Sequence, residues 1–223
     1  MKKEFEDLLK GAKACIFDMD GTLVDSLGIW TDIDKRFFHE RGMEVPFGYD
    51  TAISSMSFRE MAVYTKETYS ILESVEEIMD IWLGWSREAY LYTIKAKPGA
   101  VEFLEEMKHR GLRLSLATTN KEELYMPCLR RNGLDGFFDI IENVNRLQTK
   151  KTEPKIYLTL ARDMGVEPRE TLVFEDILMA IRTAKKASFR TVSVYDQRNE
   201  CDMKEIKAFS DYHIRNYLDI LCE

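Results

Sequence analysis

Residues 16–26 read IFDMDGTLVDS, and the predicted fold is organised around this stretch. An apolar run ends at Phe17 and Gly21 breaks it, which predicts a buried strand followed by a turn. Asp18 and Asp20 stand at the break. Ligands of an open parallel sheet bind in the crevice beyond the carboxyl ends of its strands. The stretch therefore predicts acid chemistry at that edge, where one carboxylate can act as a covalent nucleophile while the other passes a proton, as in aspartyl-phosphate chemistry.

The segment that follows predicts helices rather than strands. Between residues 27 and 97, apolar residues recur at helical spacing with little β alternation. Ser74 and Glu77 form a capping box at the head of the longest of these helices. The predicted helices of this segment cover residues 29–41, 58–70 and 75–93. Because the segment leaves from the end of the predicted catalytic strand, we expect it to lie over the active site and act as a lid.

From Pro98 onward, predicted helices and strands alternate, which implies a parallel sheet covered on both faces. The predicted strands are 14–17, 112–117, 138–141, 171–174, 191–194 and 212–214, and the helices outside the insertion are 4–10, 98–110, 121–132, 155–164, 178–187 and 215–222. The sequence therefore predicts an α/β protein with a Rossmann-like parallel sheet. Its core domain would comprise residues 1–26 and 95–223, and its α-helical cap domain residues 27–94.

Composition restricts the partners and the location. Lys and Arg number 32 against 39 Asp and Glu, a net charge of -7, which argues against nucleic acid because phosphate backbones attract basic surfaces. The four cysteines form no C-x-x-C pair, and no uncharged run approaches membrane-spanning length. The N-terminal residues lack the apolar segment of a signal peptide. We therefore expect a cytoplasmic protein without a membrane partner, a monomer or weak dimer that binds a small phosphorylated metabolite.

Asp18 and Asp20 have two simpler interpretations. The sequence D-x-D-G is a common turn signal. A calcium-binding EF-hand loop would need Gly at its sixth position, whereas Gly21 stands at the fourth. The longer string DMDGTLVDS resembles the first motif of the haloacid dehalogenase-like (HAD) superfamily. This resemblance implies that Asp18 is the phosphoryl-accepting nucleophile and that Asp20 is the general acid/base, whose main-chain carbonyl also binds the metal. It also implies that Thr22 orients the substrate-binding site.

The second motif of that family is a Ser or Thr that ends the next core strand and holds a phosphoryl oxygen. Here Thr118, Thr119 and Asn120 follow the predicted strand. Such hydroxyl groups also serve as helix caps. The resemblance does not decide between the two threonines. We favour Thr118 as the catalytic residue because it follows the strand-ending Ala117, and we assign Thr119 and Asn120 to substrate binding.

The third motif is a lysine that balances the charge of the carboxylates, metal and phosphate. Lys150 and Lys151 precede Pro154, and matching this proline to the second proline of the family's G-K-P-x-P pattern favours Lys151. Lys150 replaces the Gly of that pattern and Thr152 its first Pro, so either lysine can be the inward-facing one. A lysine pair can equally form a solvated basic turn.

The fourth motif supplies the remaining metal ligand. The string LVFED predicts a strand that delivers Glu175 and Asp176 to the same sheet edge. The resemblance makes Asp176 a direct ligand and Glu175 a direct or water-mediated one, together with Asp18 and Asp20. Oxygen ligands without clustered His or Cys suit Mg²⁺ rather than zinc. Ile177 replaces the Ser that commonly follows in this family.

The insertion resembles the helical cap of the subfamily that includes phosphoglycolate phosphatases and β-phosphoglucomutases. Arg59 occupies roughly the place of a cap arginine that meets substrate phosphate, although it is equally compatible with a surface arginine. Trp30 stands where β-phosphoglucomutases carry a histidine, which favours hydrolysis over mutase chemistry. We therefore expect a Mg²⁺-dependent phosphatase of a small phosphorylated metabolite. A phosphosugar mutase and a non-catalytic phospholigand-binding module are the alternatives, and Asp20 argues against dehalogenation.

Overall fold

The computed structural model describes residues 1–26, 28–53 and 56–221 and divides into two compact units. The core unit consists of Met1–Leu27 and Ile94–Glu223, and the helical unit of Gly28–Thr93. Leu27, where the predicted cap domain begins, and residue 222, where the predicted last helix ends, lie outside the described residues.

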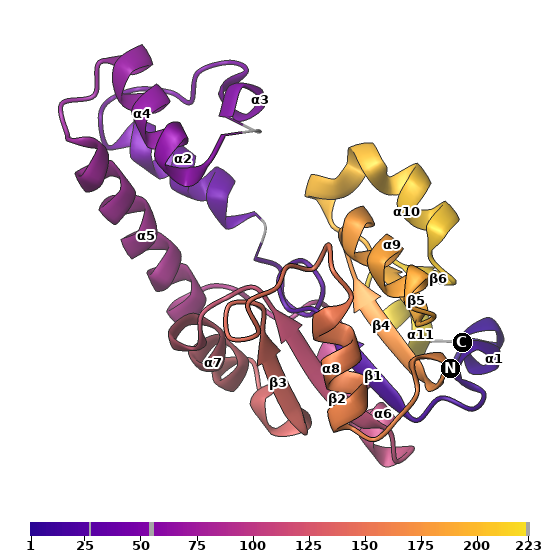
Figure 1. Cartoon of the computed structure of the whole chain (residues 1–223). Helices are drawn as coiled ribbons and strands as arrows, with labels where there is room; N and C mark the ends of the chain where they lie inside the picture. Colours follow the sequence, from indigo (N-terminus) through magenta and orange to yellow (C-terminus); the bar gives the residue numbers. More distant parts are fainter. Residues whose placement is uncertain (27, 54–55, 222–223) are drawn as a thin grey trace. The chain divides into compact units, whose positions relative to one another are not determined.

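A six-stranded parallel sheet forms the centre of the core unit (Figure 1). Its order is β3-β2-β1-β4-β5-β6, which confirms the predicted Rossmann-like α/β fold. The strands are β1 (Ala14–Phe17), β2 (Arg113–Thr118), β3 (Ile140–Asn143), β4 (Thr171–Glu175), β5 (Arg190–Val194) and β6 (Tyr212–Ile214). The strand order reverses between β1 and β4, and such a switch point creates a crevice at the carboxyl ends of the two strands.

Helices cover both faces of this sheet, which is why its central strand is apolar at every position. Ala14 and Ile16 of β1 belong to one core cluster with α8 (Lys155–Asp163) and α9 (Leu178–Lys186). Phe17, which points to the opposite face, stacks on Phe174 of β4 with ring centroids 4.5 Å apart. It also contacts Phe103 of α6. The other core helices are α1 (Lys3–Leu9), α6 (Ala100–His109), α7 (Glu122–Arg131), α10 (Met203–Phe209), α11 (Leu218–Leu221) and the 3₁₀ helices η1 (Asp135–Phe137), η2 (Pro168–Glu170) and η3 (Gln197–Asp202).

Several local features differ from the sequence predictions. Helix α6 begins at Ala100 rather than Pro98, because Gly99 is its N-cap with φ +77°. A Cβ on Gly99 would lie 2.8 Å from the amide nitrogen of Leu218, so the turn requires glycine. Strand β3 begins two residues later than predicted, because the 3₁₀ helix η1 runs to Phe137 and the parallel register with β2 starts at Ile140. The helices α3 and α10 were not predicted, and α11 begins at Leu218 rather than at residue 215.

The helical unit contains α2 (Ile29–His39), α3 (Tyr49–Ile53), α4 (Phe58–Tyr69) and α5 (Val75–Tyr92). The predicted capping box of Ser74 and Glu77 at the start of α5 is confirmed. Aromatic side chains fill the centre of this unit: the buried ring of Phe37 contacts Phe38, Trp82 and Trp85. The unit is therefore stabilised mainly by burial of large apolar side chains.

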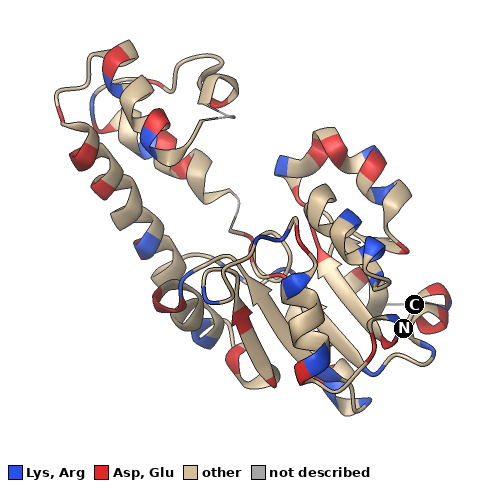
Figure 2. Ribbon diagram, in the orientation of Figure 1, with Lys and Arg blue, Asp and Glu red and all other residues tan. Residues whose placement is uncertain are grey.

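Charged residues of both signs are interspersed over each unit, as the blue and red segments of Figure 2 show. This distribution agrees with the modest net charge of -7. Among the described helices, none combines the length and apolar character needed to cross a membrane.

Candidate active site

The register of β1 against β4 brings the predicted acidic residues together. Phe17 pairs with Phe174, and the amide of Asp18 donates a 3.0 Å hydrogen bond to the Phe174 carbonyl. Asp18 and Glu175 therefore leave neighbouring strands at the same level, at the switch point of the sheet. Asp176 follows Glu175 directly, and all three residues are buried. The strand pairing itself thus places three carboxyl groups side by side.

Lys151 lies among these carboxyl groups. Its ammonium group contacts a carboxylate oxygen of Asp18 and donates a 2.7 Å hydrogen bond to Oε1 of Glu175. Burial acts to lower the pKa of Lys151, but the two carboxylates outweigh it and the pKa is raised. The side chain of Lys150, in contrast, is exposed. The structure therefore identifies Lys151 as the lysine that points toward the acidic residues.

The environment of Asp18 disfavours its ionised form relative to that of an exposed carboxyl group. Burial raises the pKa of Asp18 well above its ordinary value, with Lys151 opposing this shift and the neighbouring acidic residues reinforcing it. Burial and the charge of Glu175 likewise raise the pKa of Asp176 to about 7. Buried carboxylates so close together need additional positive charge to ionise fully.

A divalent cation would supply this charge, and the available donor atoms fit one. Asp18, Glu175 and Asp176 each offer a carboxylate oxygen, and these atoms lie within 4.8 Å of one another. Oε2 of Glu175 is buried and has no hydrogen-bond partner among the described residues, although a buried polar atom normally has one. Three carboxylates without His or Cys form the oxygen-rich ligand set of a hard cation such as Mg²⁺ or Ca²⁺.

The carboxylate of Asp20 lies outside this group of three. It accepts hydrogen bonds from Oγ of Ser26 at 2.7 Å and from Nδ2 of Asn120 at 3.1 Å. These two donors fix its orientation at the same end of the sheet. That the main-chain carbonyl of Asp20 binds the metal stays a prediction.

The two threonines after β2 are in different environments. Thr118 is buried, and its Oγ1 accepts a 3.0 Å hydrogen bond from the amide of Asn120. Thr119 is exposed. Because a hydroxyl group both accepts and donates, Thr118 keeps its O–H available as a donor. Thr22 is also buried, and its Oγ1 lies 3.4 Å from Oδ1 of Asp176.

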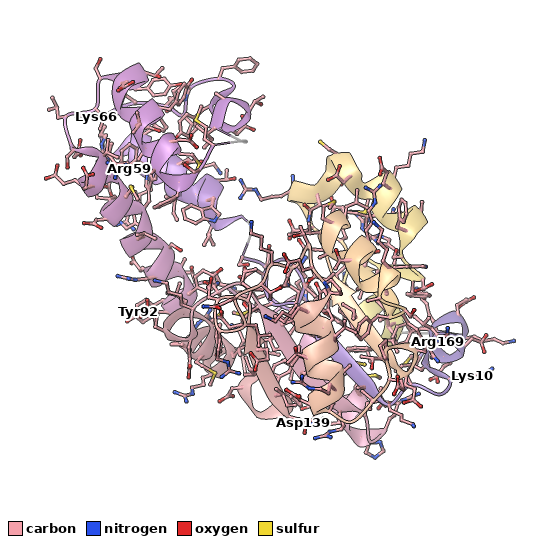
Figure 3. The ribbon with its side chains drawn as sticks, viewed as in Figure 1. Lys10, Arg59, Lys66, Tyr92, Asp139 and Arg169 are labelled. Carbon is pink, nitrogen blue, oxygen red and sulfur yellow. The ribbon has the colours of Figure 1, made fainter. Side chains whose placement is uncertain are left out.

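Arg59 belongs to the helical unit, where it lies on α4 (Figure 3). Its guanidinium group donates a 2.8 Å hydrogen bond to Glu76, and both side chains are more than half exposed. Its role toward substrate phosphate stays a prediction. Trp30 packs against Phe58, with ring centroids 5.9 Å apart, and so takes part in the aromatic core of the helical unit.

Two residues of the site were not found from the sequence. The hydroxyl of Tyr157 donates a 2.8 Å hydrogen bond to Oε1 of Glu175. Asn199 donates a 2.7 Å hydrogen bond to Oδ2 of Asp176. Tyr157 comes after the lysine motif and lies on the apolar face of α8, so the sequence indicates a core residue there rather than a site residue. Asn199 lies in a polar segment without apolar periodicity, so only the folded chain reveals its contact.

Comparisons with known proteins agree with this geometry. The family model described as "Haloacid dehalogenase-like hydrolase" matches residues 15–194. A "Phosphorylated carbohydrates phosphatase" of Thermotoga maritima is 27% identical over 180 residues, which cover 81% of this chain and 83% of that protein. A solved structure of a candidate β-phosphoglucomutase from Thermotoga maritima is 25% identical, covers 94% of this chain and 98% of that chain, and has a TM-score of 0.82. The structure of CbbY from Rhodobacter sphaeroides in complex with phosphate shares the fold, with 21% identity, coverage of 94% and 96%, and a TM-score of 0.69.

Proposed function

The chain belongs to the haloacid dehalogenase-like hydrolase family, and on this premise we propose that it is a Mg²⁺-dependent phosphatase of a small phosphorylated carbohydrate or similar metabolite. The observation that carries this proposal is the position of Lys151 between Asp18 and Glu175, at the carboxyl end of β1 and next to Asp176. The Thermotoga maritima relative, a phosphatase of phosphorylated carbohydrates, supports the substrate class.

The proposed metal site uses oxygens of Asp18 and Asp176, the main-chain carbonyl of Asp20, and Glu175 directly or through water. Bound Mg²⁺ would neutralise the repulsion between the substrate phosphate and the carboxylates, which is about 4 kcal/mol for two charges about 4 Å apart at an effective dielectric constant near 20. Lys151 has three N–H donors, and its contacts with Asp18 and Glu175 use two of them. The third would bind a phosphoryl oxygen, as would the O–H of Thr118.

In the first step, a carboxylate oxygen of Asp18 attacks phosphorus and the bond from phosphorus to the ester oxygen breaks. Asp20 gives its proton to this leaving oxygen, so the product is a neutral alcohol and Asp18 carries an aspartyl-phosphate. The hydrogen bonds from Ser26 and Asn120 hold the carboxyl group of Asp20 in one orientation for this transfer. Lys151 and Thr118 stabilise the charge on the other phosphoryl oxygens.

In the second step, Asp20 is a carboxylate and takes a proton from water. This water attacks phosphorus, the bond to Asp18 breaks, and inorganic phosphate leaves. The same residue thus acts first as acid and then as base, which returns the enzyme to its starting protonation state. Trp30 in place of the histidine of β-phosphoglucomutases supports hydrolysis rather than transfer back to a sugar, since an indole is neutral and lacks the charge of a protonated histidine.

A phosphate-release assay tests the proposal. Phosphorylated sugars and alditols would be screened with Mg²⁺ and with chelator, using the wild type and Asp18→Asn. We expect hydrolysis that requires Mg²⁺ and that falls by roughly 10³-fold or more when the nucleophile is lost. Asp25→Asn is the matched control, because Asp25 lies in the same stretch but is exposed. Turnover that persists in Asp18→Asn or in chelator contradicts the mechanism, and conversion of β-glucose 1-phosphate to glucose 6-phosphate would identify a mutase instead.

A further inference from the structure

Asn199 makes two contacts with a single residue of the proposed metal site. Its side-chain Nδ2 donates to Oδ2 of Asp176 at 2.7 Å and to the main-chain carbonyl of Asp176 at 3.2 Å. The NH₂ group of an asparagine has two hydrogens, so it can make both bonds at once. The amide therefore ties the carboxyl group of Asp176 to the main chain of the same residue and restricts the rotation of its side chain.

This restraint determines which oxygen of Asp176 can meet a cation. Oδ2 is engaged by the short bond to Asn199, whereas among the described residues the hydrogen bond to Oδ1 is the 3.4 Å contact with the hydroxyl of Thr22. Oδ1 is therefore the oxygen better suited to coordinate a metal. A donor that holds the other oxygen of a coordinating carboxylate orients the ligand, and loss of such a donor typically weakens metal binding by about 10- to 100-fold.

The segment that carries Asn199 is itself anchored by a buried ion pair. Asp196 precedes η3, and its side chain accepts a 3.1 Å hydrogen bond from the amide of Arg198. The ammonium group of Lys97 lies 3.2 Å from Oδ2 of Asp196 and 2.5 Å from the carbonyl oxygen of Tyr195. The side chains of Lys97 and Asp196 are 8% and 5% exposed, so water cannot replace this contact. The first turn of η3 is thereby fixed.

Main-chain hydrogen bonds to residues 23–25, which follow Asp18 and Asp20, hold Lys97 in place. Its main-chain amide donates a 2.8 Å hydrogen bond to the carbonyl of Leu23, and the main-chain amide of Asp25 donates one to the carbonyl of Lys95 at 2.9 Å. A continuous set of contacts thus runs from residues 23–25 through Lys97 and Asp196 to Asn199. The contacts of Lys97 with Leu23 and Asp196 join parts of the core unit that are distant in sequence, and the amide of Asn199 donates a 3.1 Å hydrogen bond to the Asp196 carbonyl within one turn.

We propose that Asn199 is a positioning residue of the metal site, which directs Oδ1 of Asp176 toward the cation and is held by the Lys97–Asp196 ion pair. The inference rests on the proposed function, because it assumes that Asp176 binds Mg²⁺. It assigns Asn199 no contact with the substrate. Its loss should therefore change the Mg²⁺ requirement and leave the rate at saturating Mg²⁺ close to that of the wild type.

Two variants test this role: Asn199→Leu keeps the volume of the side chain without its donor, and Asn199→Ala removes both. Two quantities would be measured, the Mg²⁺ concentration that gives half-maximal activity and the Mg²⁺-induced rise in melting temperature, which needs no substrate. In each measurement, we expect both variants to need a Mg²⁺ concentration at least about 10-fold higher than the wild type needs. Gln197→Ala, at an exposed position of the same helix, should behave as the wild type.

The melting temperature in chelator separates positioning from folding. If the Asn199 variants melt at the wild-type temperature without metal and respond to Mg²⁺ only at higher concentration, the positioning role is supported. If they respond to Mg²⁺ as the wild type does, or if they already melt much earlier in chelator, the inference is overturned while the proposed function stands. A wild-type protein that responds to Mg²⁺ in neither measurement would overturn both.

Discussion

The two units of the chain differ most in what they bury. In its described part, the core unit buries six charged residues, namely Asp18, Lys97, Glu142, Glu175, Asp176 and Asp196. In the described part of the helical unit, the buried polar residues are Thr65 and Ser86, and none is charged. Burial of charge is costly unless the charges are paired. The core unit therefore bears the free-energy cost of buried charged side chains, which is typical of a functional site. The interior of the helical unit is an ordinary aromatic core.

The starts of the helices differ in the same way. In the helical unit, α4 and α5 begin with complete capping boxes. In the core unit, α7, α8 and α9 follow the carboxyl side of the sheet, and the residues at their N-caps make no side-chain capping bond. Capping side chains occupy amide groups that would otherwise be open to other partners. The comparison indicates that capping side chains stabilise the first turns of α4 and α5 and that α7, α8 and α9 lack this stabilisation.

The largest expected effect concerns the pH dependence of the metal-free protein. The pKa of Asp176 is raised from 3.8 to about 7, so the folded protein keeps a proton that the unfolded chain has released between these values. The free energy of unfolding should therefore fall as the pH rises from about 4 to about 7, by up to about 4 kcal/mol. Urea unfolding in chelator, followed by circular dichroism at several pH values, would measure this.

Asp176→Asn isolates the contribution of this residue. The variant should lose much of the fall in stability between pH 4 and pH 7, and Asp80→Asn, at an exposed position of α5, should retain it. Equal pH profiles for the wild type and Asp176→Asn would show that the buried carboxyl group has no such role.

A smaller effect is expected from the ion pairs. Lys97→Met leaves Asp196 buried without its partner and should lower the free energy of unfolding by about 3 kcal/mol. Arg59→Met removes the partner of Glu76 in the helical unit, where both side chains are more than half exposed, and should cost less than about 1 kcal/mol. Urea unfolding of the two variants compares the two ion pairs directly. Similar losses in the free energy of unfolding would contradict the contrast between a buried pair in the core unit and an exposed pair in the helical unit.

Much of the core unit was predictable because its acidic site residues come directly after the ends of apolar strands. Phe17 and Phe174 end apolar runs, and parallel pairing brings the acids behind them together without further information. The sequence left two lysines open, and only the structure selects Lys151. The contacts of Asn199 and Asp196 could not be predicted, because both lie in a polar segment whose position depends on a distant residue, Lys97.

The helical unit was predictable in its secondary structure and not in its chemistry. Helices α2, α4 and α5 follow from apolar periodicity, and α5 also from its capping box; both are local signals. Helix α3, with five residues, is too short for periodicity to reveal. Arg59 illustrates the limit: its spacing fits a substrate contact, but the same side chain also forms an ordinary surface ion pair with Glu76. Local sequence cannot distinguish these roles, because they differ only in the position of a distant partner.

The smallest expected effects concern the helix starts. Ser74→Ala removes the capping box of α5 and should lower the free energy of unfolding by about 1 kcal/mol. Ile177→Ser should act in the opposite direction by a similar amount, because Ile177 has the extended backbone of an N-cap, with φ -95° and ψ 127°, and is 47% exposed. All three tryptophans, Trp30, Trp82 and Trp85, lie in the helical unit. Tryptophan fluorescence therefore reports the first variant, while circular dichroism is needed for the second. If Ile177→Ser fails to stabilise the core unit, the first amides of α9 already have other partners, and the contrast between the starts of α5 and α9 does not hold.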